Sequence, residues 1–260
     1  MAIAGDIALQ AIGLTLDYET EAGTLRVVEN VDFSIHRAER LVLLGPSGCG
    51  KSSILKAAAG FIQPSSGRIL VNGADIQGAG PDRIVVFQEF DQLLPWMTVR
   101  DNVAFPLRVA RGLSKSDART AADEALVKVG LARALDAFPH TLSGGMKQRA
   151  AIARALAAKP DILLMDEPFA ALDALTRAQL QQDLLRLAEE LNITLLFVTH
   201  SIEEAILIGT KLHLLSAHPG RTIATFDTSA FGIDNLASPE FAATIRDVGG
   251  YLGSPAKAAA

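Results

Sequence analysis

RLVLLGPSGCGKSSILKAAA, residues 40–59, is the stretch of this chain that decides its fold. It opens on a short apolar run, 40–44, which is typical of a buried strand and stops at Gly45. A helix is expected from Lys51 to about Ala59. Between strand and helix, residues 45–52 match the pattern of a phosphate-binding loop, with glycines and a lysine at the required offsets.

The chemistry of this loop suits a bound phosphate. Glycines let the backbone wrap an anion closely, so that N–H groups point at its oxygens, and the following helix adds its positive end. Lys51 is expected to reach the β- and γ-phosphates of a nucleotide, and the hydroxyl of Ser52 to ligate Mg²⁺. The predicted nucleotide-binding residues of the loop are Gly45, Pro46, Ser47, Gly48, Cys49, Gly50, Lys51, Ser52 and Ser53. A chance loop is disfavoured because an apolar strand precedes the pattern and a helix follows it.

Apolar runs and helical stripes alternate along the rest of the chain. Strands are expected at 7–16, 67–73, 84–88, 161–165 and 193–198, and helices at 117–129, 144–158 and 174–191. The region from about Leu93 to Ala137 has a helical pattern and interrupts the alternation. This order favours an α/β fold with a mostly parallel sheet covered on both faces.

Composition limits the classes of protein that remain. The chain has 260 residues, 49% apolar and 20% charged, enough for one sizeable domain. Its net charge of −5 gives no support for a nucleic-acid partner. Cys49 is the single cysteine, so no internal disulfide forms. No window holds the uncharged apolar residues that a spanning helix needs, and any membrane role is expected to come through a partner.

Two adjacent acids follow the predicted strand 161–165. A carboxylate at the C-terminal end of a parallel strand lies where ligands bind in such sheets. Asp166 is expected to hold Mg²⁺ through water, and Glu167 to orient or deprotonate an attacking water. Taken alone, a solvated acid pair in a loop is an equally good interpretation.

The string LSGGMKQR, residues 142–149, predicts a second anion site. Ser143 is placed to cap the helix that follows, and Gly144 and Gly145 leave backbone N–H groups bare at its start. An ordinary capped helix is the alternative for Ser-Gly-Gly alone. The whole string, however, resembles the signature of ABC ATPases, and the resemblance extends from about Leu9 to Arg221.

Further residues match this family in the family's order. They are Tyr18, similar to the aromatic that stacks on adenine, Gln88, similar to the Q-loop glutamine, Asp173 in the D-loop string 171–173, and His200, similar to the switch histidine. Each has another interpretation: a surface aromatic, a polar residue at a strand end, the N-cap of helix 174–191, and a hydrogen-bonded histidine at a helix start.

The resemblance implies a P-loop NTPase core with an N-terminal antiparallel β part and an inserted helical subdomain. The ATPase domain would span 1–230, with the helical subdomain at about 93–158 and a C-terminal tail at 231–260. Two ATP molecules would lie between head-to-tail subunits, with Mg²⁺. The implied catalytic residues are Glu167, His200 and Gln88, the metal ligands Ser52, Gln88 and Asp166, and the residues acting in trans Ser143, Gly144, Gly145, Gln148 and Asp173.

The resemblance also implies partners. A homodimer, or a pair with a similar ATPase, would serve two permease subunits and a solute-binding protein at the cytoplasmic face of a bacterial inner membrane. The strings 94–99 (LPWMTV) and 218–221 (HPGR) resemble the nitrate, sulfonate and taurine importer branch. Leu93, Leu94 and Trp96 either form a docking groove for the permease or pack into the helical subdomain. A non-transport ABC ATPase and a P-loop kinase are the alternatives.

Overall fold

The computed structural model describes residues 6–21 and 23–253. The chain forms two compact units. The first combines the described residues up to Gly80 with those from Asn192 onward, and the second is Pro81–Leu191. Both units contain strands and helices, which confirms the predicted α/β class.

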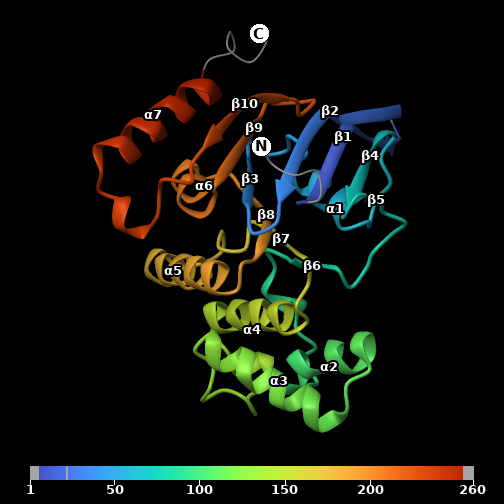
Figure 1. Ribbon diagram of the computed structural model, residues 1–260, viewed down its shortest axis with the longest axis vertical. Helices are drawn as coiled ribbons and strands as arrows, with labels where there is room; N and C mark the ends of the chain where they lie inside the picture. The colour runs from blue at the N-terminus through green and yellow to red at the C-terminus, as the bar shows by residue number, and fades with distance from the viewer. Residues whose placement is uncertain (1–5, 22, 254–260) are drawn as a thin grey trace. The chain divides into compact units, whose positions relative to one another are not determined.

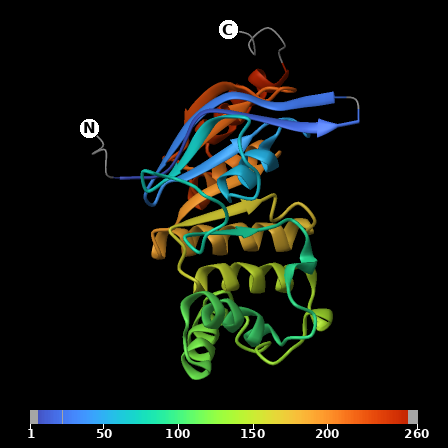
Figure 2. The ribbon, with the colours of Figure 1, turned by 90° about the vertical axis from the view of Figure 1, so that its right-hand side faces the viewer.

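An antiparallel sheet in the first unit confirms the expected N-terminal β part. Strands β1 (Ile7–Thr20) and β2 (Gly23–His36) form a long hairpin, drawn in blue in Figure 2. Strand β4 (Ser66–Val71) pairs with the other edge of β1, and β5 (Ala74–Asp75) follows it. β1 extends beyond the predicted end at Leu16, because its last residues keep partners in β2.

The first unit also holds the strand that leads into the phosphate loop. β3 (Arg40–Leu44) lies between β8 (Thr194–Thr199) and β9 (Lys211–Leu215), and all three are parallel. β10 (Thr222–Asp227) closes this part of the sheet with antiparallel pairing to β9. Every residue of β3 and β8 is buried, which accounts for the apolar runs 41–44 and 195–198 within them.

The α-helices of this unit, within the described residues, accompany these strands (Figure 1). They are α1 (Lys51–Ala58), α6 (Ile202–Ile208) and α7 (Pro239–Gly253). α7 falls within the region expected to be a tail, where no motif was found in the sequence. Its Phe241 and Val248 are buried, so this part of the chain joins the hydrophobic core.

The second unit contains the predicted helical region. α2 (Val99–Arg111), α3 (Lys115–Lys128) and α4 (Gly144–Ala157) pack against one another within the expected span 93–158. The unit also contains the parallel strands β6 (Arg83–Val86) and β7 (Ile162–Asp166) and the helix α5 (Ala174–Glu190). No helix within the described ranges is long and apolar enough to cross a membrane.

Candidate functional site

The backbone of the predicted phosphate loop favours glycine at two positions. Gly48 and Gly50 have φ of 79° and 93°, in the left-handed region that favours glycine. A Cβ on Gly50 would lie 2.4 Å from Cγ2 of Val28 and 2.9 Å from the carbonyl oxygen of Val27. Gly50 is also the residue before α1, so the helix begins with backbone N–H groups that no side chain caps.

Lys51 already points into this loop. Its Nζ donates to the carbonyl oxygens of Gly45 at 2.8 Å and Pro46 at 2.9 Å, and its side chain is buried. The loop therefore holds a positive charge at the point where the sequence predicts phosphate oxygens. An anion entering the loop would replace carbonyl partners with charged ones, which form stronger hydrogen bonds to an ammonium.

Tyr18 lies beside the start of α1. Its hydroxyl donates to Oγ of Ser53 at 3.1 Å, and the tyrosine is half-buried at the far end of β1. Ser52 and Ser53 occupy the first turn of α1, directly after Lys51. The tyrosine predicted to stack on adenine is thus bonded to the helix that follows the predicted phosphate loop.

A turn that the sequence motifs did not single out for this site packs against the phosphate loop. Between β9 and β10, Gly220 N donates to Val27 O at 2.9 Å, and Gly220 O accepts from Glu29 N at 3.0 Å. A Cβ on Gly220 would lie 2.0 Å from the carbonyl oxygen of Cys49. In the sequence the string 218–221 carries only a subfamily resemblance, and its glycine is required by this close approach.

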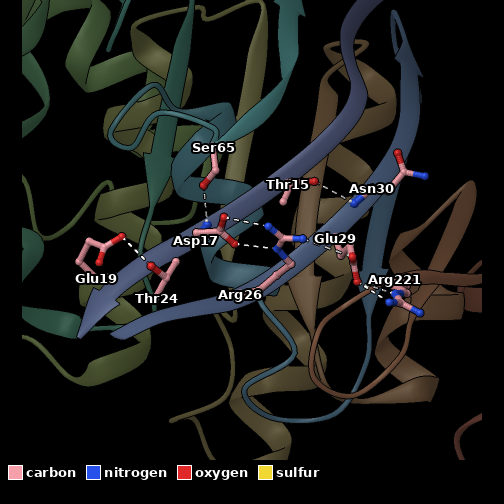
Figure 3. Close-up of polar contacts among 9 residues, drawn as sticks. All are labelled: Thr15, Asp17, Glu19, Thr24, Arg26, Glu29, Asn30, Ser65 and Arg221. Carbon is pink, nitrogen blue, oxygen red and sulfur yellow. Dashed lines mark hydrogen bonds and ion pairs between the residues drawn. The ribbon is translucent and has the colours of Figure 1, made fainter. Parts of the chain in front are cut away.

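Charged side chains link the same turn to the β1–β2 hairpin (Figure 3). Arg26 pairs with Asp17 at 2.9 Å and with Glu29 at 3.4 Å, and Arg221 pairs with Glu29 from the other side. The hydrogen bond from Arg26 lowers the pKa of Asp17, and that from Arg221 lowers the pKa of Glu29. These pairs are exposed to solvent, so they orient the turn more than they stabilise the fold.

The predicted acids follow β7 in the second unit. β7 ends at Asp166, and Glu167 comes next with φ of 43°, a left-handed conformation that a residue other than glycine rarely adopts. Pro168 and Phe169 behind it are buried. Local strain of this kind persists where the surrounding structure holds a residue in a required orientation, and it gathers at functional sites.

The starts of α4 and α5 lie together in this unit. Ser143 caps α4, its Oγ accepting from Met146 N at 3.3 Å, as the sequence predicted. Asp173 caps α5 by accepting from Thr176 N at 3.0 Å, and this bond lowers the pKa of Asp173. A Cβ on Gly145 would lie 2.6 Å from Cγ2 of Thr176. The absence of a side chain at Gly145 therefore allows α4 and α5 to approach each other, in addition to leaving the backbone N–H groups at the start of α4 uncovered.

The remaining predicted residues occupy strand ends. Gln88 is exposed two residues after β6, and His200 is exposed directly after β8, where Ser201 caps α6. Gln148 differs from the other signature residues, because its side chain is fully buried and faces Gln92. The phosphate loop, Tyr18 and His200 belong to the first unit, and the other predicted site residues belong to the second.

The apolar residues after Gln88 differ in their burial. Leu93 is buried, whereas Trp96 is 70% exposed. Trp96 borders a cleft of about 300 Å³ in the second unit. The cleft is lined by Trp96, Met97, Thr98, Asp101, Ala104, Phe105, Arg108, Lys115, Arg119 and Phe138. This set is called the aromatic cleft below.

Comparison with known proteins agrees with these features. A family model described as "ABC transporter" matches residues 28–170. The chain is 50% identical over 204 residues to the taurine import ATP-binding protein TauB of Rhizobium johnstonii, covering 78% of this chain and 77% of that one. It is 44% identical over 220 residues to the nitrate import ATP-binding protein NrtD of Synechococcus elongatus, covering 84% and 79%.

Solved structures give the same result. The dimeric structure of MJ0796, a bacterial ABC transporter cassette, matches with a TM-score of 0.75 and 32% identity, covering 85% of this chain and 98% of that one. A dimeric post-hydrolysis state of the same cassette bound to ADP and Pi matches with a TM-score of 0.73 and 30% identity, covering 85% and 98%.

Proposed function

Because this chain belongs to the ABC transporter family of ATP-binding cassettes and is an ATPase, we propose that it energises the import of a small anion through partner permeases. The observation that carries the proposal is the glycine loop that holds the ammonium of Lys51 at the start of α1. Relatives named for taurine and nitrate import support a sulfonate, nitrate or related anion as the solute.

In this proposal the first unit binds ATP. The backbone N–H groups of residues 48–53 and the ammonium of Lys51 take the phosphates, exploiting the helix N-terminus. Tyr18 provides the stacking surface for adenine, and its bond to Ser53 sets the distance between base and phosphate positions. His200 contacts the γ-phosphate.

The donor set fits Mg²⁺ carried with the nucleotide. Among the described residues, no group of three or more histidine, cysteine, aspartate or glutamate side chains could hold a metal ion by itself. Mg²⁺ characteristically keeps several waters and binds through one or two carboxylates together with substrate phosphates. The Ser52 hydroxyl, the Asp166 carboxylate and the Gln88 amide oxygen are the oxygens assigned to it. When bound, the metal supplies neutralisation of charge on the phosphates.

Hydrolysis then depends on Glu167. Its carboxylate orients the attacking water and accepts its proton as the water oxygen bonds to the γ-phosphorus and the bond to the β–γ bridging oxygen breaks. The products are ADP and inorganic phosphate. The left-handed backbone at Glu167 supports this role, because strained residues other than glycine gather at functional sites.

Completion of each site requires a second subunit. Ser143, Gly144 and Gly145 at the start of α4, with Asp173 nearby, face the γ-phosphate held by the partner copy. Gln148, buried behind them, would act from inside its own subunit. ATP then joins the two subunits, and loss of the γ-phosphate releases them, which is switching by differential binding. The partner is a second copy or a similar ATPase.

The aromatic cleft is the proposed contact with the permease. It combines exposed Trp96 and Phe138 with cationic Arg108 and Lys115, whereas its Arg119 is paired with Asp101 at 3.0 Å. An apolar helix of the permease carrying a carboxylate would complement this surface. Two permeases and, through them, a solute-binding protein would place the chain at the cytoplasmic face of the membrane.

The decisive test of hydrolysis is Glu167→Gln. The variant should bind ATP with unchanged affinity, form a dimer with ATP by size-exclusion chromatography, and hydrolyse it roughly 10²-fold more slowly or worse. Glu189→Gln, which removes an exposed carboxylate from α5, is the matched control and should keep the wild-type rate. Turnover of the Glu167 variant at the wild-type rate would remove Glu167 from the mechanism.

The import proposal has its own test. A strain deleted for this gene should lose uptake of labelled taurine, an alkanesulfonate or nitrate. The wild-type gene should restore it and the Glu167→Gln gene should not. If uptake of all three anions is independent of the gene, the solute class is wrong, whatever the outcome of the hydrolysis assay.

A further inference from the structure

One side chain, Gln92, fixes the backbone on both sides of Gln88. Gln92 closes the short 3₁₀ turn Phe90–Gln92 that follows β6. Its Oε1 accepts from Phe87 N at 3.2 Å, and its Nε2 lies 3.0 Å from both Phe87 O and Glu89 O. The side-chain amide of Gln92 thus forms hydrogen bonds with backbone groups of the residues before and after Gln88.

The same residue is also bound to α4. Nε2 of Gln92 is 3.4 Å from Oε1 of Gln148, and Arg154 Nη1 donates to the backbone oxygen of Gln92 at 2.7 Å. Both partners come from the helix that Ser143 caps. Burial lowers the pKa of Arg154, which places this link in a poorly solvated environment. Hydrogen bonds in such surroundings are stronger than those in water.

Gln148 gives a second reason to regard this contact as functional. Its side chain is 0% exposed, and within the described part of the chain its Nε2 has no hydrogen-bond partner. A buried donor without an acceptor destabilises the folded state. The presence of Gln148 at this position therefore needs a reason other than a contribution to stability.

We propose that Gln92 is a positioning residue that couples the signature helix α4 to Gln88. A displacement of α4, whether by the partner subunit or by a permease at the aromatic cleft, then moves the peptide groups on both sides of Gln88. The inference rests on the proposed function, because it assumes that Gln88 acts on the metal or the attacking water.

The test replaces Gln92 with methionine, which has similar length and makes none of the hydrogen bonds of the Gln92 side chain, while the backbone oxygen that accepts from Arg154 remains. Gln92→Met should lower kcat roughly ten- to a hundredfold, as small misplacements of catalytic groups do. ATP affinity measured with a fluorescent analogue should be unchanged, and half-maximal activity should need more Mg²⁺. Asp91→Asn is the matched control, since it breaks an exposed ion pair between the same turn and Lys147 of the same helix. It should change kcat by less than about twofold.

A double-mutant cycle separates positioning from a loss of structure. If Gln92 acts through Gln88, the pair Gln88→Ala with Gln92→Met should be no slower than Gln88→Ala alone. Multiplying defects, or an equal defect in Asp91→Asn, would overturn the proposal. Should Gln92→Met fail to fold, Gln148→Met is put through the same assays and cycle. A wild-type rate for Gln88→Ala would instead count against the proposed function.

Discussion

The hydroxyl of Tyr18 donates to Oγ of Ser53 across 3.1 Å, joining the end of β1 to the first turn of α1. The two residues are 35 positions apart in the chain. Their bond brings the aromatic expected at the base of ATP to the helix that follows the phosphate loop. Nucleotide affinity should therefore depend on the ring of Tyr18 and on its position.

Tyr18→Ala and Tyr18→Phe should separate these two contributions. Loss of the ring should raise the Kd for ATP roughly tenfold or more, because stacking on a base contributes about 1–3 kcal/mol. Tyr18→Phe keeps the ring and loses only the half-buried bond to Ser53, so Kd should rise less than about fivefold. Isothermal titration of both variants checks this, and equal Kd values for wild type and Tyr18→Ala would rule out the stacking role.

Cys49 should resist alkylation at neutral pH. Its side chain is 1% exposed, and burial raises the pKa of the thiol more than Lys51 lowers it. Only the thiolate reacts, so labelling by iodoacetamide should be slow at pH 7 and accelerate as the pH approaches the raised pKa. Labelled protein should lose ATP binding through added bulk, and ATP should protect the thiol. Mass spectrometry follows labelling, and full ATPase activity after complete alkylation would refute the prediction.

His213 should make the fold sensitive to mild acid. Burial lowers its pKa from 6.5 to about 4, and its ring lies between the hydroxyls of Thr222 at 2.7 Å and Thr225 at 3.2 Å. The unfolded chain binds the proton below pH 6.5 while the folded chain does not. The free energy of unfolding should therefore fall as the pH drops from 6.5 to about 4, by at most about 3 kcal/mol.

Urea denaturation at pH 7 and pH 5 tests this dependence. His213→Leu should be less stable than wild type at pH 7, since two hydroxyls lose a partner, and the gap should narrow at pH 5. If the difference in free energy of unfolding between wild type and His213→Leu is the same at pH 7 and pH 5, His213 does not titrate between these pH values.

Gly145→Ala should destabilise the protein although alanine favours helices. The new methyl group would lie 2.6 Å from Cγ2 of Thr176, and such overpacking costs about 1–3 kcal/mol. Gly250→Ala in α7 meets nothing within 4 Å and should instead stabilise by roughly 0.5–1 kcal/mol. Thermal unfolding of the two variants checks the contrast, and a stabilised Gly145→Ala would mean that α4 and α5 are farther apart.

Much of the local geometry of the candidate site was predictable because it depends on the spacing of nearby residues. The loop 45–53, the acids after β7 and the caps at Ser143 and Asp173 each combine residues within a few positions of one another. Strand limits were less accurate. β1 continues to Thr20 because Thr20 pairs with Gly23 of β2. The sequence of β1 alone does not indicate where its partner strand ends.

The apolar residues after Gln88 show where a local pattern became ambiguous. Leu93, Leu94 and Trp96 have the same hydrophobic character in the sequence, yet Leu93 is buried and Trp96 is exposed. Only the packing of α2 and α4 around this segment separates a core residue from a surface one. The same holds for Gln148, whose complete burial cannot be read from the signature string.

The sequence by itself determined which groups could bind phosphate, because backbone shape, a lysine and a helix start are set within eight consecutive residues. Tertiary structure alone decided which distant residues pack against the predicted phosphate loop and the signature helix α4. Gly220 lies against Cys49, Thr176 against Gly145, and Gln92 against Gln148. Such contacts depend on the path of the whole chain, since each joins residues that are separated by more than thirty positions and meet only after the strands and helices have packed.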